Sequence, residues 1–144
     1  MKRININMVQ PEAYKAMLGM EKYIRESGLS PKLCELIKVR ASQINGCAYC
    51  VDMHTQEALK NGETSQRLFA VTAWKESPLF TDEERAALQM TDEITLISKD
   101  AVSDETYNKV LELHGEENLA RIIMQIIIIN SWNRIAVSTH MIFE

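Results

Sequence analysis

The sequence is divided along its length by residues that start and end helices, which leaves little that indicates a strand. Pro11 can open a first helix and Gly28 can close it. Ser30 followed by Pro31 is a strong second start, because the hydroxyl can cap free N–H groups and proline suits the first helical turn. We expect this second helix to end at Asn45 and Gly46, and a third to run from near Cys47 to Asn61 and Gly62. Others start at Thr64 or Ser65, at the capping box of Thr81 and Glu84, and at Ser103, from where the helix runs to about His114. The last helix runs from roughly Glu117 to Thr139. These signals predict an all-α fold of about six helices.

Composition and charge narrow the class of protein. The chain has 144 residues, of which 46% are hydrophobic and 25% charged, so we expect one domain over residues 1–144. A net charge of -4 argues against nucleic acid as a partner. Met1 to Val9 do not resemble a secretory signal, and the apolar stretch Ile122 to Ile129, interrupted by Gln125, is far shorter than the roughly 20 residues of a membrane span. We therefore expect a cytoplasmic protein with no membrane partner.

The last predicted helix is apolar on more than one face, because the residues from Ile122 to Ile129 are nearly all isoleucine. The isoleucine run could favour a strand by local propensity, but the length and polar spacing around it favour a helix. A domain of this size has little chain with which to cover such a helix. We therefore expect part of the surface to pack against another subunit of an oligomer.

Two of the three cysteines, Cys47 and Cys50, are only three residues apart, which fits a working dithiol in a reducing compartment. If Gly46 ends one helix and Cys47 lies in the first turn of the next, the free N–H groups and the helix dipole favour thiolate over thiol. The spacing also brings the two sulfur atoms close enough to close a disulfide.

His54 lies four residues after Cys50, so its imidazole is expected on the same helical face, where it could accept the thiol proton. A thiolate can attack the O–O bond of a hydroperoxide, become a sulfenic acid and condense with a second thiol to a disulfide. We assign Cys50 as the attacking residue, because it is nearer His54 in helical register, and Cys47 as the resolving residue. The pattern predicts a thiol peroxidase.

The cysteine pair also has simpler interpretations. A C-x-x-C pair can be half of a structural zinc site, but zinc needs four ligands and no second C-x-x-C or paired-histidine motif is present. A thioredoxin-like motif needs alternating strands and helices around it. Coincidental core cysteines remain open, and a small buried side chain is the simplest interpretation of Cys34. We expect no metal and no cofactor.

The segment RASQINGCAYC from Arg40 to Cys50, with Glu35 before it and His54, Ala58 and Gly62 after it, resembles the AhpD-like alkylhydroperoxidase core of the carboxymuconolactone decarboxylase family. The resemblance covers roughly residues 29–73. It implies an all-helical subunit that assembles as a homotrimer or homohexamer, and peroxidase activity on organic hydroperoxides with a dithiol protein as reductant. It further implies a proton relay in which Glu35 and His54 serve the Cys50 thiol.

One position departs from the family pattern. Some members carry a histidine just before the second cysteine, where this chain has Tyr49, a poor base near neutral pH.

Two other functions stay open beside the peroxidase. One is a cofactorless decarboxylase or lactone-processing enzyme that uses His54 and Glu35, and the other is a non-enzymatic redox sensor in which the disulfide changes helix packing.

Overall fold

The computed structural model describes residues 1–143, and these form helices and connecting turns without any strand. The predicted all-α fold is confirmed, with seven α-helices and one 3₁₀ turn over the described residues. Their bounds are α1 Ile6–Val9, α2 Pro11–Glu26, α3 Pro31–Ile44, α4 Ala48–Lys60, α5 Ser65–Ala70, η1 Val71–Ala73, α6 Asp82–Thr95 and α7 Asp104–Thr139.

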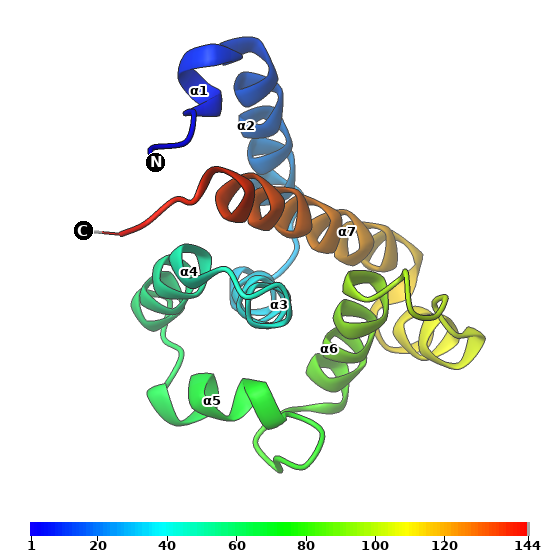
Figure 1. The fold of residues 1–144 in the computed structure, drawn as a ribbon. Helices are drawn as coiled ribbons and strands as arrows, with labels where there is room; N and C mark the ends of the chain where they lie inside the picture. Colours follow the sequence, from blue (N-terminus) through cyan, green and yellow to red (C-terminus); the bar gives the residue numbers. More distant parts are fainter. Residues whose placement is uncertain (144) are drawn as a thin grey trace.

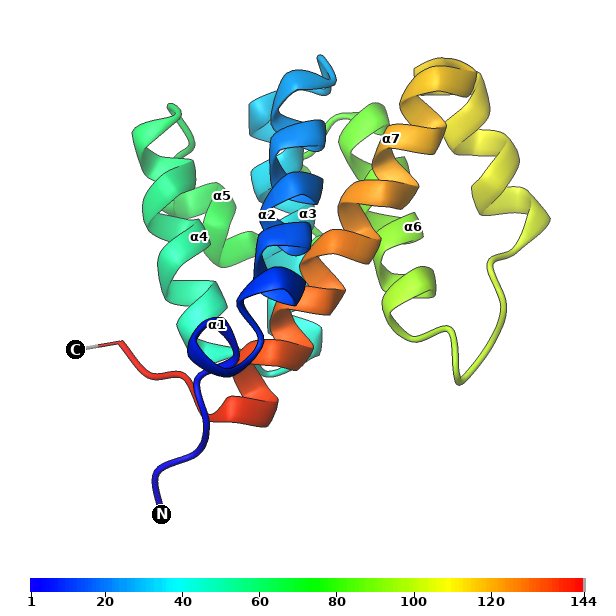
Figure 2. The ribbon, with the colours of Figure 1, turned by 90° about the horizontal axis from the view of Figure 1, so that it is seen from above.

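Helix α3 lies at the centre of the fold, seen nearly end-on with α4, α5, α6 and α7 around it (Figure 1). It is buried on more than one side, because Leu36, Ile37 and Val39 have no exposed surface although they point in different directions around the helix. In the view from above, α7 crosses the bundle diagonally beside α3 (Figure 2). Side chains on the side of α3 that faces α4 are therefore held in place by the core of the protein.

Most helix starts follow the expected capping chemistry. The Ser30 side chain accepts from the Leu33 N–H, and Thr81 and Glu84 form both bonds of a capping box. The short helix α1, in which the Asn5 side chain accepts from the Met8 N–H, was not predicted. Its single turn shows no hydrophobic periodicity and buries no residue, so the sequence offered only the cap as a signal.

Gly115 divides α7, as the sequence predicted for a break between two helices. Its φ of 77° lies in the left-handed region, where residues with a Cβ are disfavoured. After this break the isoleucine run is helical, with Ile122, Ile126 and Ile129 buried. Ile127, by contrast, is 42% exposed. No helix within residues 1–143 is both long and apolar enough to cross a membrane.

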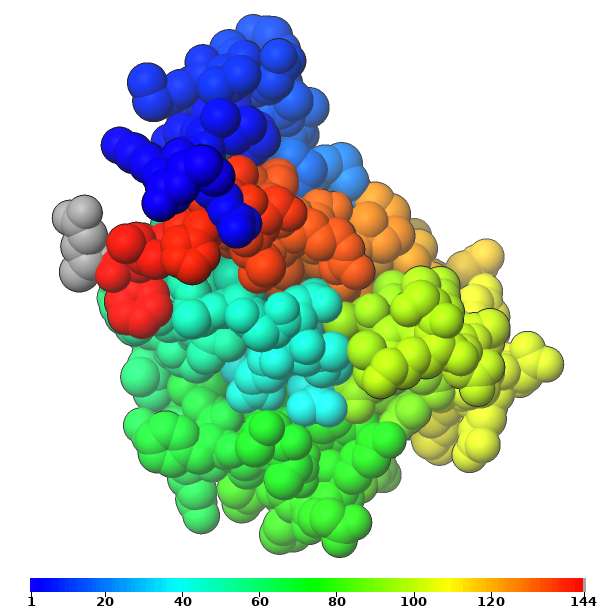
Figure 3. Space-filling model, in the orientation of Figure 1, coloured from blue at the N-terminus to red at the C-terminus, as the bar shows by residue number. Residues whose placement is uncertain are grey.

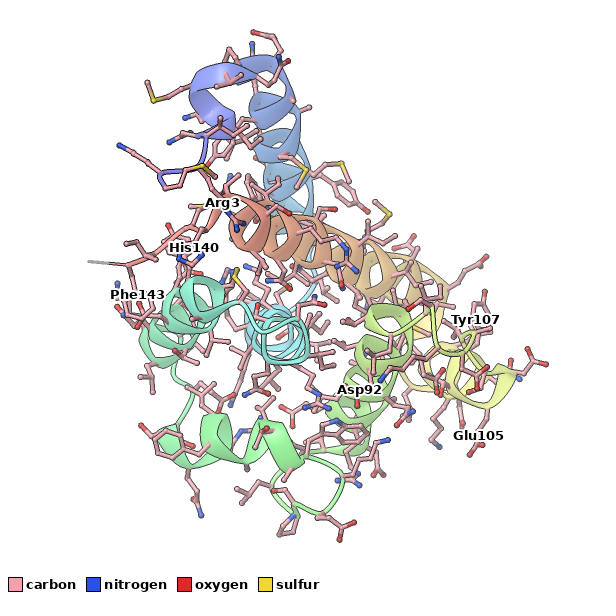
Figure 4. The ribbon with its side chains drawn as sticks, in the orientation of Figure 1. Arg3, Asp92, Glu105, Tyr107, His140 and Phe143 are labelled. Carbon is pink, nitrogen blue, oxygen red and sulfur yellow. A yellow bond between two sulfur atoms is a disulfide. The ribbon has the colours of Figure 1, made fainter. Side chains whose placement is uncertain are left out.

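Helix α2 projects from one side of the molecule, where it contacts α7 (Figure 3). It reaches α7 through an edge-to-face contact between the rings of Tyr14 and Trp132, and the Trp132 indole donates to Glu21 at 2.8 Å. Arg3 reaches the carboxyl end of α7, where its guanidinium donates to the Ser138 carbonyl at 2.9 Å (Figure 4). These contacts hold α2 and the segment around Arg3 against α7.

Candidate active site

Cys47 and Cys50 form a disulfide at the start of α4, with 5.3 Å between their Cα atoms. Cys47 is the N-cap of the helix, and its sulfur accepts from the Cys50 N–H at 3.2 Å. Gly46, with a φ of 65°, makes the tight turn that separates α3 from α4. Both cysteines are only 2% exposed. The expected disulfide and the expected position at a helix N-terminus are therefore both present.

A network of amides, of which only that of Asn133 is fully buried, fixes this turn against α7. The Asn45 side chain donates to Asn130 at 3.0 Å and to Asn133 at 2.9 Å. Asn133 in turn donates to the Ser42 hydroxyl at 2.9 Å. The sequence left open whether the polar residues of the last helix form a subunit contact or approach the active site. Asn130 and Asn133 hold the cysteine-bearing turn in place.

His54 and Glu35 meet between the facing sides of α4 and α3. The His54 Nδ1 atom lies 3.6 Å from one Glu35 oxygen, too far for a hydrogen bond, and 3.1 Å from a Glu57 oxygen, which it can hydrogen-bond. Both His54 and Glu35 are 6% exposed. The second Glu35 oxygen accepts from the Lys38 ammonium group at 3.2 Å.

The electrostatics favour a charged imidazole. Burial alone would lower the pKa of His54, but the carboxylates of Glu35 and Glu57 outweigh it and raise that pKa above its ordinary value. The pKa of Glu57 is lowered, chiefly because the side chain bonds to His54. An imidazolium at this place can hold a proton close to the cysteine pair.

A cavity of about 510 Å³ opens beside the redox pair. Cys50, His54 and Glu35 all line it, whereas Cys47 is not among the described residues of its wall. Tyr49 also lines it and packs against the buried cluster of Cys47, Cys50 and Ala136. The volume is in the range of small-molecule sites. A molecule bound in the cavity would therefore lie next to Cys50 rather than Cys47.

Glu35, His54 and Glu57 are also the types of residue that bind metal ions. Single ligand atoms of Glu35, His54 and Glu57 lie within 4.8 Å of one another. The Lys38 ammonium group already neutralises Glu35, and a cation would compete with it. Neither cysteine belongs to this group of possible ligands. The arrangement suits proton transfer better than metal binding.

Sequence reasoning missed three residues of the site. Glu57 lies three positions after His54 and Lys38 three after Glu35, so each i, i+3 spacing was a readable signal. Gln125 lines the cavity from α7, and its signal was the single polar residue within an isoleucine run. Cys34 is buried as expected, lines the same cavity, and burial raises the pKa of its thiol to about 11.

Comparison with known proteins gives the family. Residues 11–93 match the model of the carboxymuconolactone decarboxylase family. The uncharacterized protein YdfG of Bacillus subtilis (strain 168) is 45% identical over 136 residues, which cover 94% of this chain and 92% of that protein. A protein of unknown function from Agrobacterium tumefaciens, Atu0492, proposed to be the antioxidant defence protein AhpD, superposes with a TM-score of 0.96 at 39% identity over 100% of this chain and 99% of the other.

A more distant structure shares the fold alone. An uncharacterized peroxidase-related protein from Silicibacter sp. TM1040 superposes with a TM-score of 0.81 at 23% identity, over 92% of this chain and 71% of the other. The family match covers more than half of the chain and includes the cysteine pair, His54 and Glu35. The chain therefore belongs to the carboxymuconolactone decarboxylase family, as an AhpD-like member.

Proposed function

We propose that the protein is a thiol peroxidase that reduces organic hydroperoxides through Cys50 and Cys47, with His54 and Glu35 as the proton relay. The observation that carries this proposal is the buried Cys47–Cys50 disulfide whose second cysteine shares a cavity wall with His54. We further propose a dithiol protein as the reductant, a homotrimer or homohexamer as the assembly, and the cytoplasm as the location.

The proposed reaction has three steps: oxidation of Cys50, formation of the disulfide and its reduction. In the reduced protein the Cys50 thiolate attacks the terminal oxygen of a hydroperoxide, the O–O bond breaks, and Cys50 becomes a sulfenic acid while an alkoxide leaves. His54 takes the thiol proton beforehand and returns it to the alkoxide, which gives the alcohol. The Cys47 thiol then displaces water from the sulfenic acid to form the disulfide, and two thiols of the reductant reopen it by exchange.

The assignment of roles rests on position. Cys50 lines the cavity, whereas Cys47 caps α4 behind it, so substrate reaches Cys50 first and Cys47 resolves it. The raised pKa of His54 favours the protonated imidazole, and its positive charge stabilises a neighbouring thiolate. Glu35 acts through His54 and is a positioning residue in this scheme.

The test is the oxidation of the reduced protein by cumene hydroperoxide, followed by mass spectrometry of each cysteine. The native chain should form the Cys47–Cys50 disulfide, Cys50→Ser should form none, and Cys47→Ser should accumulate the Cys50 sulfenic acid. Cys34 is the internal reference, because a buried thiol of raised pKa should stay reduced.

The competing functions give different results in the same variants. A decarboxylase or lactone-processing enzyme would keep its activity when both cysteines are replaced by serine. A redox sensor would form the disulfide and change its assembly without catalytic turnover of hydroperoxide. Oxidation of Cys50 no faster than that of an ordinary exposed thiol would overturn the peroxidase proposal.

A further inference from the structure

Gln125 is a buried amide that forms no hydrogen bond with the described residues. Its side chain has no exposed surface, and both its amide nitrogen and its amide oxygen lack a partner. It also lines the 510 Å³ cavity that holds Cys50 and His54. An unpartnered polar side chain that faces a cavity is a place where a bound molecule can supply the missing hydrogen bonds.

The amide is unfavourable for folding as it stands, because burial removes its bonds to water without replacing them. Its neighbours in the chain, Met124 and Ile126, show that the position lies within an apolar helix where leucine or isoleucine would avoid this penalty. Buried polar groups without a partner are rare in native proteins and call for an explanation. Binding of a ligand explains an amide at this position.

The cavity runs along one face of α7. Gln125, Trp132 and Ala136 all line it, and their spacings of seven and four residues place them on the same side of the helix. Ala136 and Cys50 both line the cavity and belong to one buried cluster, so this end of the cavity holds the sulfur. Gln125 lies eleven residues away from Ala136, which is about 16 Å along a helix. The amide therefore meets the part of a substrate that is distant from the peroxide.

Apolar side chains make up much of the cavity wall. Tyr14, Leu18 and Ile24 line it from α2, and Trp132 lines it from α7. Such a wall removes apolar surface from water and favours a hydrocarbon body. A substrate that fills the cavity thus has an apolar body.

Charge excludes an anionic end for that substrate. The cavity is lined by the acidic residues Glu21, Glu35 and Glu57 and by the basic residues Arg25, Lys38 and His54, so positive charges do not outnumber negative ones even with a charged imidazole. Lys38 is already bonded to Glu35, and Arg25 is exposed to solvent. No excess positive charge is left to hold a carboxylate, whereas a neutral amide donates to and accepts from a hydroxyl or another amide.

We propose that Gln125 binds the distal end of the substrate, and that the cavity selects neutral organic hydroperoxides with an apolar body and an uncharged hydrogen-bonding group far from the peroxide. This inference rests on the proposed peroxidase function and adds the class of substrate to it. Gln125 is a specificity residue, since it touches the substrate away from the reacting atoms.

Binding can be tested without turnover. Straight-chain alcohols from butyl to dodecyl, with either a methyl or a second hydroxyl at the far end, are titrated into the disulfide form. Fluorescence of Trp132 reports the binding, because Trp74 lies outside the cavity wall. At the length that fits, the diol should bind the native chain about five- to tenfold more tightly than the methyl-ended alcohol. In Gln125→Leu the preference should reverse, because the methyl group then contacts leucine.

Gln43→Leu is the matched control. Gln43 also has a buried amide oxygen without a partner, but it does not line the cavity. This variant should keep the preference of the native chain for the diol. If Gln125→Leu does not fold, Gln125→Met supplies an unbranched side chain of similar size.

The same pair of end groups on alkyl hydroperoxides separates this inference from the proposed function. For the hydroxyl-ended hydroperoxide, Gln125→Leu should raise KM about five- to tenfold and leave kcat unchanged. A native chain that binds the diols but reduces no hydroperoxide overturns the peroxidase proposal alone. A native chain that reduces both substrates equally well, or a preference that Gln125→Leu does not alter, overturns the role of Gln125.

Discussion

The two ends of α3 both carry buried charged groups, but only one of them is fully paired. Near its carboxyl end, Arg40 donates to both oxygens of Asp92 at 2.6 and 3.1 Å, and the Trp74 indole donates to the same carboxylate at 3.2 Å. Near its amino end, Glu35 receives one bond from Lys38, and its other oxygen has no hydrogen bond although it lies 3.6 Å from His54.

The difference separates stability from chemistry on one helix. The Arg40–Asp92 pair joins α3 to α6 in a bidentate arrangement (Asp92 is marked in Figure 4), so both carboxylate oxygens are already bonded and have less capacity left for a proton or a ligand. The Glu35 oxygen and His54 keep that capacity beside the cavity. Loss of the first cluster should therefore affect folding, and loss of the second should affect turnover.

The largest effect is expected for His54→Ala. Removal of the imidazole should slow Cys50 oxidation by a hydroperoxide about 10³-fold, because the His54 imidazole takes the thiol proton and returns it in the proposed scheme. Stopped-flow measurement of the reduced protein gives the rate. His114→Ala is the control, since His114 contacts the Glu83 carbonyl outside the cavity and should oxidise at the native rate.

A rate in His54→Ala within threefold of the native rate would contradict the relay. An equal loss of oxidation rate in His54→Ala and His114→Ala would instead mean that the change is a general effect on the fold.

The second effect is on stability. Asp92→Ala should lower the free energy of unfolding by about 3 kcal/mol, because it leaves Arg40 partly buried without its carboxylate. Urea unfolding of the disulfide form measures it. Glu35→Ala, measured in parallel, should cost less than half as much. A Glu35 variant as unstable as the Asp92 variant would remove the contrast between the two ends of α3.

A smaller effect is expected for Trp74→Phe. The variant keeps most of the buried ring but removes the indole N–H that donates to Asp92, at a cost of about 1–2 kcal/mol. Urea unfolding again reports it, and Cys50 oxidation per folded molecule should not change. A slower oxidation would mean that the paired cluster acts on the active site.

The smallest effect is the pH dependence contributed by Glu57. The folded-state pKa of His54 is raised above its ordinary 6.5, so the stabilisation it provides is complete below 6.5 and is lost as the pH rises through the folded-state pKa. The pKa of Glu57 is lowered from 4.5, so its share is complete above 4.5 and is lost as the pH falls through the lowered value.

Glu57→Gln should therefore be destabilised most between about pH 4.5 and 6.5, by less than about 1 kcal/mol because Glu57 is nearly half exposed. An NMR titration of the disulfide form should place the His54 pKa above 6.5 in the native chain and lower in Glu57→Gln. An unchanged His54 pKa in the variant would contradict the contribution of Glu57.

Much of the fold and part of the candidate site could be predicted from local sequence. Caps such as Ser30 and Thr81 set helix starts, and Gly115 sets the break in α7, because each acts on its own few residues. The i, i+3 and i, i+4 spacings likewise place Cys47, Cys50 and His54 on one helix face whatever surrounds it.

Long-range partners depended on tertiary packing, because two side chains on different helices meet only when the core decides how those helices cross. The sequence by itself determined the helices and the disulfide-forming pair. Only the fold decided that Glu35 of α3 lies beside His54, that Asn133 of α7 holds the cysteine turn, and that Gln125 faces the cavity without a partner. Hydrogen bonds reach about 3 Å, so these contacts exist only where packing brings distant residues within that reach.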